Sequence, residues 1–332
     1  MGNLSDKIFS VVHYVANKVQ RPAVVLLYHR VTTLPQDPQE LSVTPANFSA
    51  HLAHLASDYH VLDADQFLYH VKNKKPFPER SVFITFDDGY ADNYLEALPL
   101  LEQHQTPALF YITTSKINTG YELWWDDLER VLLTAESLPP VLNIGINGQT
   151  WQYATNTLQS IKDTYYALQQ VLRFCKPDVI DATMQQLYQW AGTDAAGRVS
   201  HRLMTWDELR AMSGSKQVTI GCHTHRHPAV GMLSYDEQYH EIGQSKEILE
   251  GVLHAPQVHF SYPFGGRKFL GSKRYYNADS IKACKALGLQ LVCANYHGQV
   301  HTWSNPYALP RILVRDWAPD VFSRNMQQFF KY

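Results

Sequence analysis

The chain has 332 residues, of which 45% are hydrophobic and 18% are charged, so its composition is that of a folded globular protein and excludes a disordered or fibrous one. Lysine and arginine number 29 against 31 aspartate and glutamate, which gives a net charge of −2. Because binding to a nucleic-acid backbone usually requires a basic excess or stripe, we expect no nucleic-acid partner.

The first 20 residues predict an amphipathic helix and not a secretory signal. Their apolar residues recur at helical spacing, and polar side chains interrupt the apolar run of about 7 to 15 residues that a signal needs. No stretch reaches the roughly 18 apolar residues of a membrane span. The four cysteines form no C-x-x-C pair and are expected to be buried, reduced thiols. We therefore expect a cytoplasmic protein without a membrane span, and the sequence leaves its oligomeric state open.

Short apolar runs predict strands at 23–28, 81–86, 108–113, 218–222, 258–262, 289–294 and 309–314. Helical patterns lie between them, at 45–57, 91–104, 235–253 and 277–287. Strands that are apolar nearly throughout and that alternate with helices are typical of a parallel sheet buried on both faces. The pattern therefore predicts an α/β fold, either a barrel or a doubly wound sheet.

Residues 115–205 interrupt this alternation and are expected to form an insertion between two strands. Helical patterns at 122–136, 157–174 and 178–191 flank an alternating stretch with Asn147–Gly148 at its centre, which is a strong hairpin signal. The insertion shows no cluster of titratable residues with useful spacing. We therefore predict helices and one hairpin here, and not a separate catalytic domain.

Two adjacent carboxylates, Asp87 and Asp88, follow the strand 81–86. Chemistry in a parallel β/α fold takes place where strands end, and a tight bend at Gly89 can aim both carboxylates into one pocket. The alternative is that one of them caps the following helix. A cap explains one aspartate and not two, and Asp92 is already available for it.

Two histidines, His223 and His227, follow the strand 218–222. They are four residues apart, and on a helical segment this spacing lets both imidazoles face one metal. Alone the spacing is near chance in a chain with 16 histidines, so its value comes from the aspartates at another strand end. His225 would point away and is expected beside the site or at the surface.

The two histidines and Asp88 predict a metal site with three protein ligands, which leaves positions open for water and substrate, as in catalytic sites. Zn²⁺ suits these ligands best, and Co²⁺, Mn²⁺ and Ni²⁺ are also compatible with them. A metal here would activate water and polarise a carbonyl, and Asp87 would remain free to take the proton of the water.

Three runs of the sequence resemble the first three motifs of the polysaccharide deacetylase, or NodB-homology, family. They are ITFDDGY (84–90), HTHRHP (223–228) and FSYPFGG (260–266). The resemblance covers most of residues 22–315 and implies a deformed β/α barrel of about seven strands, extending over 21–332. It also implies a divalent metal and the hydrolysis of acetyl groups on sugars.

The resemblance also assigns roles to residues. Asp87 resembles the catalytic base, and Asp88, His223 and His227 resemble the metal ligands. Phe264 occupies the position at which the third motif supplies a backbone N–H to the oxyanion, where a fixed donor stabilises developing charge.

The sequence departs from the family at the residue that holds the base. The third motif usually begins with an arginine, but Ser261 stands in its place. Arg311, in the strand LPRIL, is a candidate to pair with Asp87 instead. The alternative is that Arg311 forms an ion pair at the surface or in a loop.

The family's late histidine, which serves as general acid, is absent after Arg311. His29 follows the strand 23–28 and resembles the permuted arrangement of deacetylases that act on exported poly-N-acetylglucosamine. We predict His29 as the acid, because an amine leaves poorly unless it is protonated. The alternative is a histidine that is hydrogen-bonded in the core or a loop.

Aromatic residues near the motifs are candidates for substrate contacts. Tyr28 and Tyr262 could stack on a sugar ring, and Trp125 could line the cleft, but core packing explains each of them equally well.

These features predict a metal-dependent hydrolase that removes an N-acetyl group from a sugar or polysaccharide by cleaving a linear amide C–N bond. The expected partner is an acylated sugar, a glycan, or a lipid- or nucleotide-linked precursor. Two alternatives remain open: a deformylase or other non-peptide amide hydrolase with the same site, and a glycan-binding module with impaired catalysis.

Overall fold

The structure of the chain is a computed structural model that describes residues 21–266 and 273–331. The helix predicted over 1–20 lies outside these ranges. Within them, a curled parallel sheet forms the centre of the molecule, and no helix is long and apolar enough to cross a membrane.

The sheet contains eight parallel strands. They are β1 (Ala23–Tyr28), β4 (His60–Val61), β5 (Ser81–Phe86), β6 (Ala108–Ile112), β9 (Val218–Cys222), β10 (His259–Ser261), β11 (Leu291–Cys293) and β12 (Ile312–Leu313). Seven of them follow the order β11-β10-β9-β6-β5-β1-β12, and β4 pairs with the first residues of β5. The seven strands coincide with the seven that the sequence predicts.

The segment before β12 closes the sheet. Leu309 exchanges backbone hydrogen bonds with Val292 and Ala294, at 2.9 and 2.8 Å, while Ile312 pairs with Leu26 of β1. One segment therefore joins both ends of the strand order. The sheet curls into a deformed barrel, which confirms the predicted fold class.

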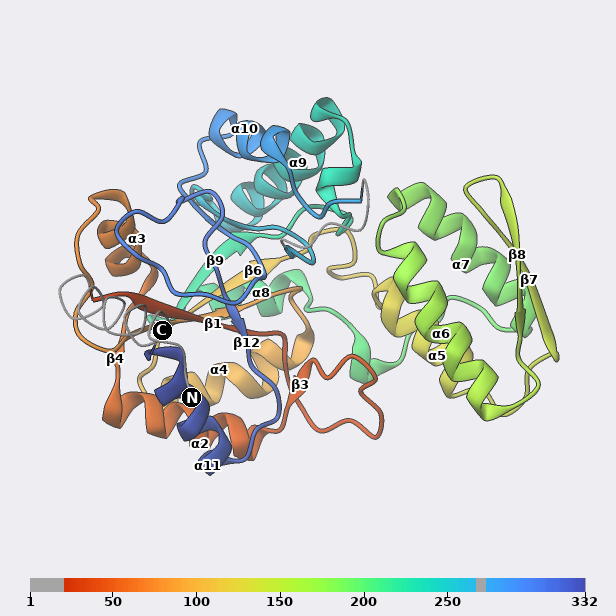
Figure 1. Ribbon diagram of the computed structural model, residues 1–332, viewed down its shortest axis with the longest axis horizontal. Coiled ribbons are helices and arrows are strands. Elements are labelled where there is room, and N and C mark those ends of the chain that lie inside the picture. Colours follow the sequence, from red (N-terminus) through yellow and green to blue (C-terminus); the bar gives the residue numbers. More distant parts are fainter. Residues whose placement is uncertain (1–20, 267–272, 332) are drawn as a thin grey trace, which may run out of the picture.

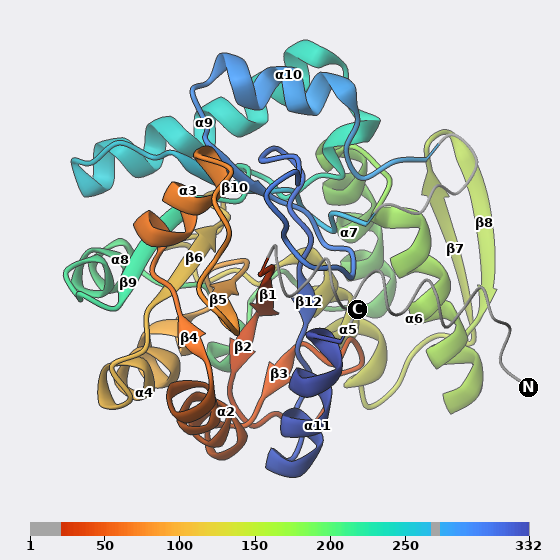
Figure 2. The same cartoon turned by 60° about the vertical axis from the view of Figure 1, so that its left-hand side comes forward.

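Helices surround the barrel (Figure 1). They are α2 (Pro45–Asp58), α3 (Ala64–Lys72), α4 (Leu98–Gln103), α8 (Trp206–Ser213), α9 (Tyr235–Leu253), α10 (Ala278–Ala286) and α11 (Pro319–Phe329). The pair α9 and α10 packs together on one side of the sheet, and α2 and α11 pack together on the opposite side (Figure 2). Capping boxes begin several of the chain's helices, at Asp63–Gln66, Thr157–Ser160, Thr205–Glu208, Ser234–Glu237 and Asn277–Ser280.

The helix predicted at 91–104 is divided into two parts. A π-helical turn, Asn93–Ala97, precedes α4. Asp92 forms no cap, contrary to expectation, because its carboxylate accepts hydrogen bonds from the side chain of Arg30 at 2.9 Å and the N–H of Val31 at 3.1 Å. Arg30 and Val31 form β2 (Arg30–Val31), which pairs with β3 (Ser42–Val43).

The odd-numbered residues of the strands point into the barrel. The hydroxyl of Tyr111 donates to Cys293 Sγ at 3.2 Å, and the guanidinium of Arg311 lies 5.5 Å from the Tyr111 ring and 3.3 Å from Thr85 Oγ1. Because strand residues alternate between faces, the odd positions at the ends of the strands or directly next to them continue this inward series. They are His29, Asp87, His223, Ser261 and Arg311. The four cysteines are buried and free, as predicted.

Strand β6 pairs directly with β9, so the residues between them leave the sheet. Most of this excursion lies to one side of the barrel (Figure 1). It contains α5 (Trp124–Leu133), β7 (Val141–Ile146), β8 (Gln149–Ala154), α6 (Leu158–Leu172) and α7 (Pro177–Ala191). Asn147 and Gly148 both have positive φ, +51° and +75°, as a two-residue hairpin turn requires.

Candidate active site

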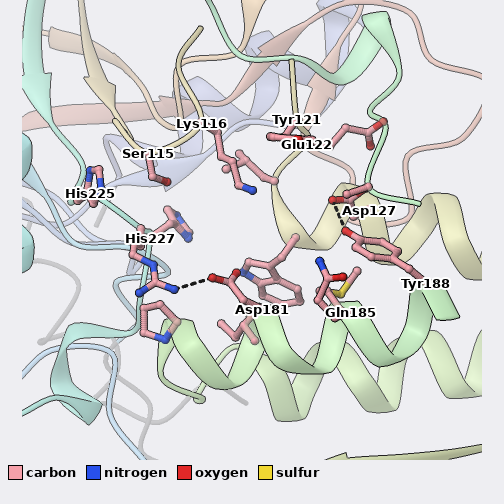
Figure 3. A pocket seen from close by; sticks show the side chains of 17 residues that line it. Ser115, Lys116, Tyr121, Glu122, Asp127, Asp181, Gln185, Tyr188, His225 and His227 are labelled. Carbon is pink, nitrogen blue, oxygen red and sulfur yellow. Dashed lines mark hydrogen bonds and ion pairs between the residues drawn. The ribbon is translucent and has the colours of Figure 1, made fainter. Parts of the chain in front are cut away.

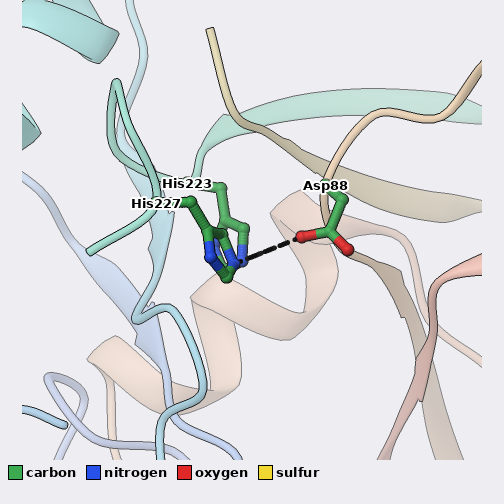
Figure 4. A group of neighbouring side chains, drawn as sticks. All are labelled: Asp88, His223 and His227. Carbon is green, nitrogen blue, oxygen red and sulfur yellow. Dashed lines mark ion pairs between the residues drawn. The ribbon is translucent and has the colours of Figure 1, made fainter. Parts of the chain in front are cut away.

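Asp88, His223 and His227 come together beyond the carboxyl ends of β5 and β9, with the two imidazoles facing the carboxylate (Figure 4). Asp88 Oδ1 lies 3.6 Å from His223 Nε2 and 3.3 Å from His227 Nε2. Ligands held about 2.1 Å from a tetrahedral metal ion lie about 3.4 Å apart. The separations therefore fit one divalent cation.

The hydrogen bonds of these side chains leave their ligand atoms free. His223 Nδ1 lies 2.8 Å from the carbonyl of Ser261; it donates there, and its Nε2 lone pair then faces Asp88. Asp88 Oδ1 is buried and has no hydrogen-bond partner among the described residues. Burial alone would raise the pKa of Asp88, but contact with His227 lowers it below its usual value. A buried, ionised oxygen that faces two imidazoles suits a bound cation.

The loops that carry the ligands have unusual backbone conformations. Asp88, Thr224 and His227 have φ of +79°, +67° and +57°, in the left-handed region that costs energy for residues other than glycine. The segment 223–227 is therefore not a helical turn, and the predicted reason for its two histidines facing one metal is wrong. A hydrogen bond of 3.0 Å from the N–H of His227 to Thr224 Oγ1 turns the loop back instead.

Asp87 forms a buried bidentate ion pair with Arg311. Arg311 Nη1 and Nη2 lie 2.7 and 2.6 Å from the two carboxylate oxygens of Asp87, and Nη2 also donates to Ser261 Oγ at 2.6 Å. Burial alone would raise the pKa of Asp87, but the charge of Arg311 outweighs it and lowers the pKa to about 2. The carboxylate is therefore ionised at neutral pH. Ser261, which stands where an arginine is expected, contacts the arginine that pairs with Asp87.

His29 lies directly after β1, and the charges of Asp87 and Asp88 act on its imidazole. Its carbonyl accepts a hydrogen bond of 2.9 Å from the side chain of Asn93, and its Nδ1 is buried without a partner in the described part of the chain. Burial lowers the pKa of His29, and this effect outweighs the charges of Asp88 and Asp87, which raise it. A protonated His29 would therefore release its proton readily.

Two aromatic rings pack against His227, a candidate metal ligand. The ring of Trp125 lies 4.6 Å from the His227 ring, and that of Phe264 lies 4.8 Å from it. Phe264 has a φ of +60°, and its N–H donates to no described residue. A Cβ on the next residue, Gly265, would lie 2.4 Å from the backbone nitrogen of Asn295, so only glycine is compatible with this turn.

Tyr262 and Tyr28 lie away from the site, so of the two alternatives left open by the sequence, sugar contact and core packing, the structure shows core packing. Tyr262 is fully buried, stacks on Tyr276 at 4.5 Å and donates to the carbonyl of Tyr307 at 3.1 Å. Tyr28 is also fully buried and stacks on Phe86 at 5.3 Å. Both have even numbers and so point out of the barrel toward its helices. Proximity to a motif in sequence does not place a strand residue on the same face as the motif.

The insertion contains a buried cluster of titratable residues, so the expectation that it has no such cluster is wrong. Asp126, Glu129 and His201 have ligand atoms within 4.8 Å of one another. Arg198 already supplies positive charge there, because it binds Glu129 at 3.1 Å and Glu122 at 2.8 Å. The acids at 122, 126 and 129 have the spacing of one helical face, which is a signal available in the sequence, although Glu122 precedes α5 in the structure. Arg198 carries no such signal.

This cluster connects the insertion to the candidate metal site through Tyr90. The Tyr90 hydroxyl donates to Asp126 at 2.7 Å and accepts a hydrogen bond of 2.9 Å from Trp125 Nε1. The guanidinium of Arg30 stacks on the Tyr90 ring at 4.3 Å. Because Trp125 packs on His227, the insertion fixes one wall of the site. No sequence pattern singles out Tyr90 as the link between the insertion and this site.

Comparison with known proteins identifies relatives of this chain. The family model described as polysaccharide deacetylase matches residues 74–136 and 160–292. YxkH of Bacillus subtilis (strain 168), named for the same family, is 27% identical over 301 residues, which cover 90% of this chain and 74% of YxkH. The poly-beta-1,6-N-acetyl-D-glucosamine N-deacetylase of Staphylococcus aureus (strain MRSA252) is 27% identical over 168 residues. That match covers 44% of this chain and 54% of the S. aureus protein.

Solved structures share the fold. The Streptococcus pyogenes deacetylase PplD, in complex with acetate, superposes with a TM-score of 0.59 at 16% identity, over 92% of this chain and 99% of PplD. IcaB from Ammonifex degensii gives a TM-score of 0.59 at 15% identity, over 94% and 97% of the two chains. These likenesses show a common fold, and the family model covers more than half of the residues. The chain therefore belongs to the polysaccharide deacetylase family.

Proposed function

We propose that the chain is a metal-dependent carbohydrate N-deacetylase that hydrolyses the acetamide groups of N-acetylglucosamine residues in a polysaccharide. The observation that carries the proposal is the bidentate pairing of Arg311 with Asp87 beside three metal ligands. Metal-dependent hydrolases use an ionised carboxylate beside the cation site to take a proton from water. The S. aureus relative is named as a poly-beta-1,6-N-acetyl-D-glucosamine N-deacetylase, which supports the choice of sugar.

The ligand set Asp88, His223 and His227 supports a divalent ion in this site, and we propose zinc. When bound, the ion would polarise the acyl carbonyl and lower the pKa of water. Co²⁺, Mn²⁺ and Ni²⁺ can take the same ligands, so metal analysis of the purified protein decides between them.

The remaining residues transfer protons, orient the base or stabilise the oxyanion. Asp87 accepts the proton of the attacking water, and Arg311 fixes the orientation of its carboxylate. His29 donates a proton to the departing amine. The N–H of Phe264 donates to the oxyanion that forms from the carbonyl, a contribution of several kcal/mol in related acyl-transfer sites, about 2.7–4 for one donor. Trp125 holds His227 in place.

The proposal is tested with the full chain, loaded with zinc, and β-1,6-linked N-acetylglucosamine oligomers. We expect release of acetate together with one free amine per acetate. N-formyl sugars and non-sugar amides are assayed in parallel. Turnover of only those substrates would replace the proposal with a deformylase or another amide hydrolase.

The third candidate, a glycan-binding module, is separated by binding measurements. Measurable binding of the oligomers without release of any acyl group, in protein that contains metal, would support the module.

We also propose that the protein is cytoplasmic. Fractionation of cells that produce the chain tests this location.

A further inference from the structure

The hairpin of β7 and β8 lies at the end of the insertion farthest from the barrel (Figure 1), and the two strands pair with each other and with no other described strand. The helix α7 covers the edge of β7. There the side chain of Gln186 bonds to the N–H and the carbonyl of Gly145, at 2.9 and 3.1 Å. Trp190 donates to the carbonyl of Val141 at 2.9 Å. One edge of this small sheet is therefore occupied by the chain itself.

The edge of β8 presents peptide groups that have few partners. Gly145 turns its peptide groups toward α7, so it does not bond to Thr150, which lies opposite it in the register. Because the pattern alternates, Thr150, Gln152 and Ala154 point their peptide groups away from β7. No described residue bonds to those of Thr150 and Gln152. The carbonyl of Ala154 accepts from Thr164 Oγ1 at 3.1 Å and retains its second lone pair.

This edge lacks the features that protect most exposed strands from pairing. Edge strands usually carry charged residues, a proline or a bulge. Strand β8 contains neither charge nor proline, its register with β7 is unbroken, and five of its six residues are exposed. The uncharged run extends over residues 137–161, in a chain of which 18% is charged. Such an edge is a template for another extended strand.

The absence of charge favours a second copy of the same chain as the partner. A two-fold axis places the residues nearest to it against their own copies, so a charged residue there would meet a like charge. An uncharged edge avoids this repulsion. Two β8 strands can pair antiparallel about an axis at Gln152, which places Thr150 opposite Ala154 of the second copy. The outward peptide groups then meet in hydrogen-bonded pairs.

The same register brings aromatic rings together. The rings of Trp151 and Tyr153 are nearly parallel, with an interplanar angle of 6° and centroids 6.4 Å apart, and Trp151 is 39% exposed. In the paired strands, Trp151 lies opposite Tyr153 of the second copy at a non-hydrogen-bonded position, where side chains approach most closely. Aromatic cross-strand pairs stabilise sheets, and the two-fold axis produces this pair twice.

We infer that β8 is a dimerisation edge, at which two copies of this chain join their hairpins into one four-stranded antiparallel sheet. Because α7 covers the edge of β7, each copy offers one edge and the assembly closes as a dimer. The interface is small, so we expect a Kd on the order of 10 µM. The inference goes beyond the proposed function and does not depend on it.

Pairing at β8 leaves the candidate active site accessible. A hollow of about 500 Å³ beside His227 lies where the insertion meets the barrel, and Gln185 and Tyr188 of α7 border it (Figure 3). No residue of β8 lines this hollow. Acetate release per chain should therefore be the same in the monomer and the dimer.

Sedimentation equilibrium of the zinc-loaded full chain, from about 1 to 200 µM, tests the dimer across its expected Kd. We expect the mass to rise from one chain to two and no further. The mass of one chain at every concentration would overturn the inference. Growth beyond two chains would contradict a closed dimer.

Charges placed at the axis test the register. Gln152→Lys and Gln152→Glu should each raise the Kd at least about tenfold, because each places two like charges together. An equal mixture of the two variants should recover a dimer with one copy of each. Gln189→Lys, the same change at an exposed position of α7, should leave the Kd unchanged. Thermal unfolding of each variant confirms that it is folded.

Two further results would overturn the assignment of this edge. One is a wild-type Kd in both Gln152 variants, and the other is a mixture that remains monomeric. The mass measurement and the acetate assay fail separately. A wild-type protein that dimerises without releasing acetate contradicts the proposed function and supports the dimer, and an active monomer does the reverse.

Discussion

Arg311 and Asp87 are 224 residues apart in sequence, yet two hydrogen bonds of 2.7 and 2.6 Å join the guanidinium to both carboxylate oxygens. Arg311 is 1% exposed and Asp87 is 4% exposed, so the pair has little contact with water. Removing one partner of a buried ion pair leaves an uncompensated charge and costs about 3–5 kcal/mol. The residue that would activate water is therefore also a determinant of stability.

Arg311→Met should lower the free energy of unfolding by about 3–5 kcal/mol, because Asp87 loses its counter-charge in a buried place. The double variant Arg311→Met/Asp87→Asn should recover much of this loss and remain inactive. Urea unfolding measures both. Arg324→Met, which breaks an exposed ion pair with Asp320, is the matched control and should cost at most about 1 kcal/mol. A single variant as stable as the wild type would contradict the argument.

Asp87→Asn should reduce acetate release by about 10²–10⁴-fold, the contribution of a positioned general base. Its metal content should remain one ion per chain, because Asp88, His223 and His227 are unchanged. Asp88→Ala should lose both the metal and the activity. Elemental analysis of dialysed protein, together with an acetate assay, distinguishes these outcomes. Full activity in Asp87→Asn would rule out its role as base.

His29→Gln should slow amide hydrolysis by about 10²–10⁴-fold and leave the hydrolysis of an activated aryl acetate ester within a few-fold of wild type. The reason is that an amine must be protonated before it departs, whereas an aryl oxide need not be. His240→Gln, at an exposed position on α9, is the control. Equal losses on amide and ester would show that His29 has another role.

Asp126→Asn should make the protein more stable at alkaline pH than the wild type. Burial, the largest cause, raises the pKa of Asp126 well above its usual value. A raised folded pKa means that the wild-type protein loses stability as pH rises from about 4, the unfolded value, through the folded pKa. Asparagine does not ionise, and its carbonyl can still accept from Tyr90.

Thermal unfolding at several pH values checks this prediction. The melting temperature of Asp126→Asn should exceed that of the wild type at pH 8, and the difference should shrink toward pH 4. Asp163→Asn, which alters an exposed aspartate on α6, should show no such trend. A pH-independent difference for Asp126→Asn would mean that the residue is already ionised or already neutral throughout this range.

Local patterns in the sequence were enough to predict the strands and the residues at their ends. Buried parallel strands are apolar nearly throughout, and polar residues that follow them stand out. This is why Asp88, His223 and His227 were found, and the structure brings their ligand atoms within 4.8 Å of one another. The hairpin at Asn147–Gly148 follows equally from local turn chemistry.

Features that depend on strand order or on partners distant in the sequence were harder to predict from the sequence. The proximity of Arg311 to Asp87 requires β1 to lie between β5 and β12, which no local pattern specifies. The partnership of Arg198 with Glu122 spans 76 residues. Tyr262 was misplaced because it follows Ser261, and neighbouring residues at a strand end point in opposite directions.

The closing segment that carries Arg311 also has a consequence for biosynthesis. Every other residue of the proposed site lies between His29 and Phe264, so the ribosome produces them before the arginine that steadies the base. Domains begin to fold from the N-terminal side during synthesis, at about 5–20 residues per second. A nascent chain that ends before residue 309 would expose the edge of β1 and leave Asp87 without its partner. Hydrolytic competence should therefore arise only when this segment docks, which delays activity until the barrel is complete.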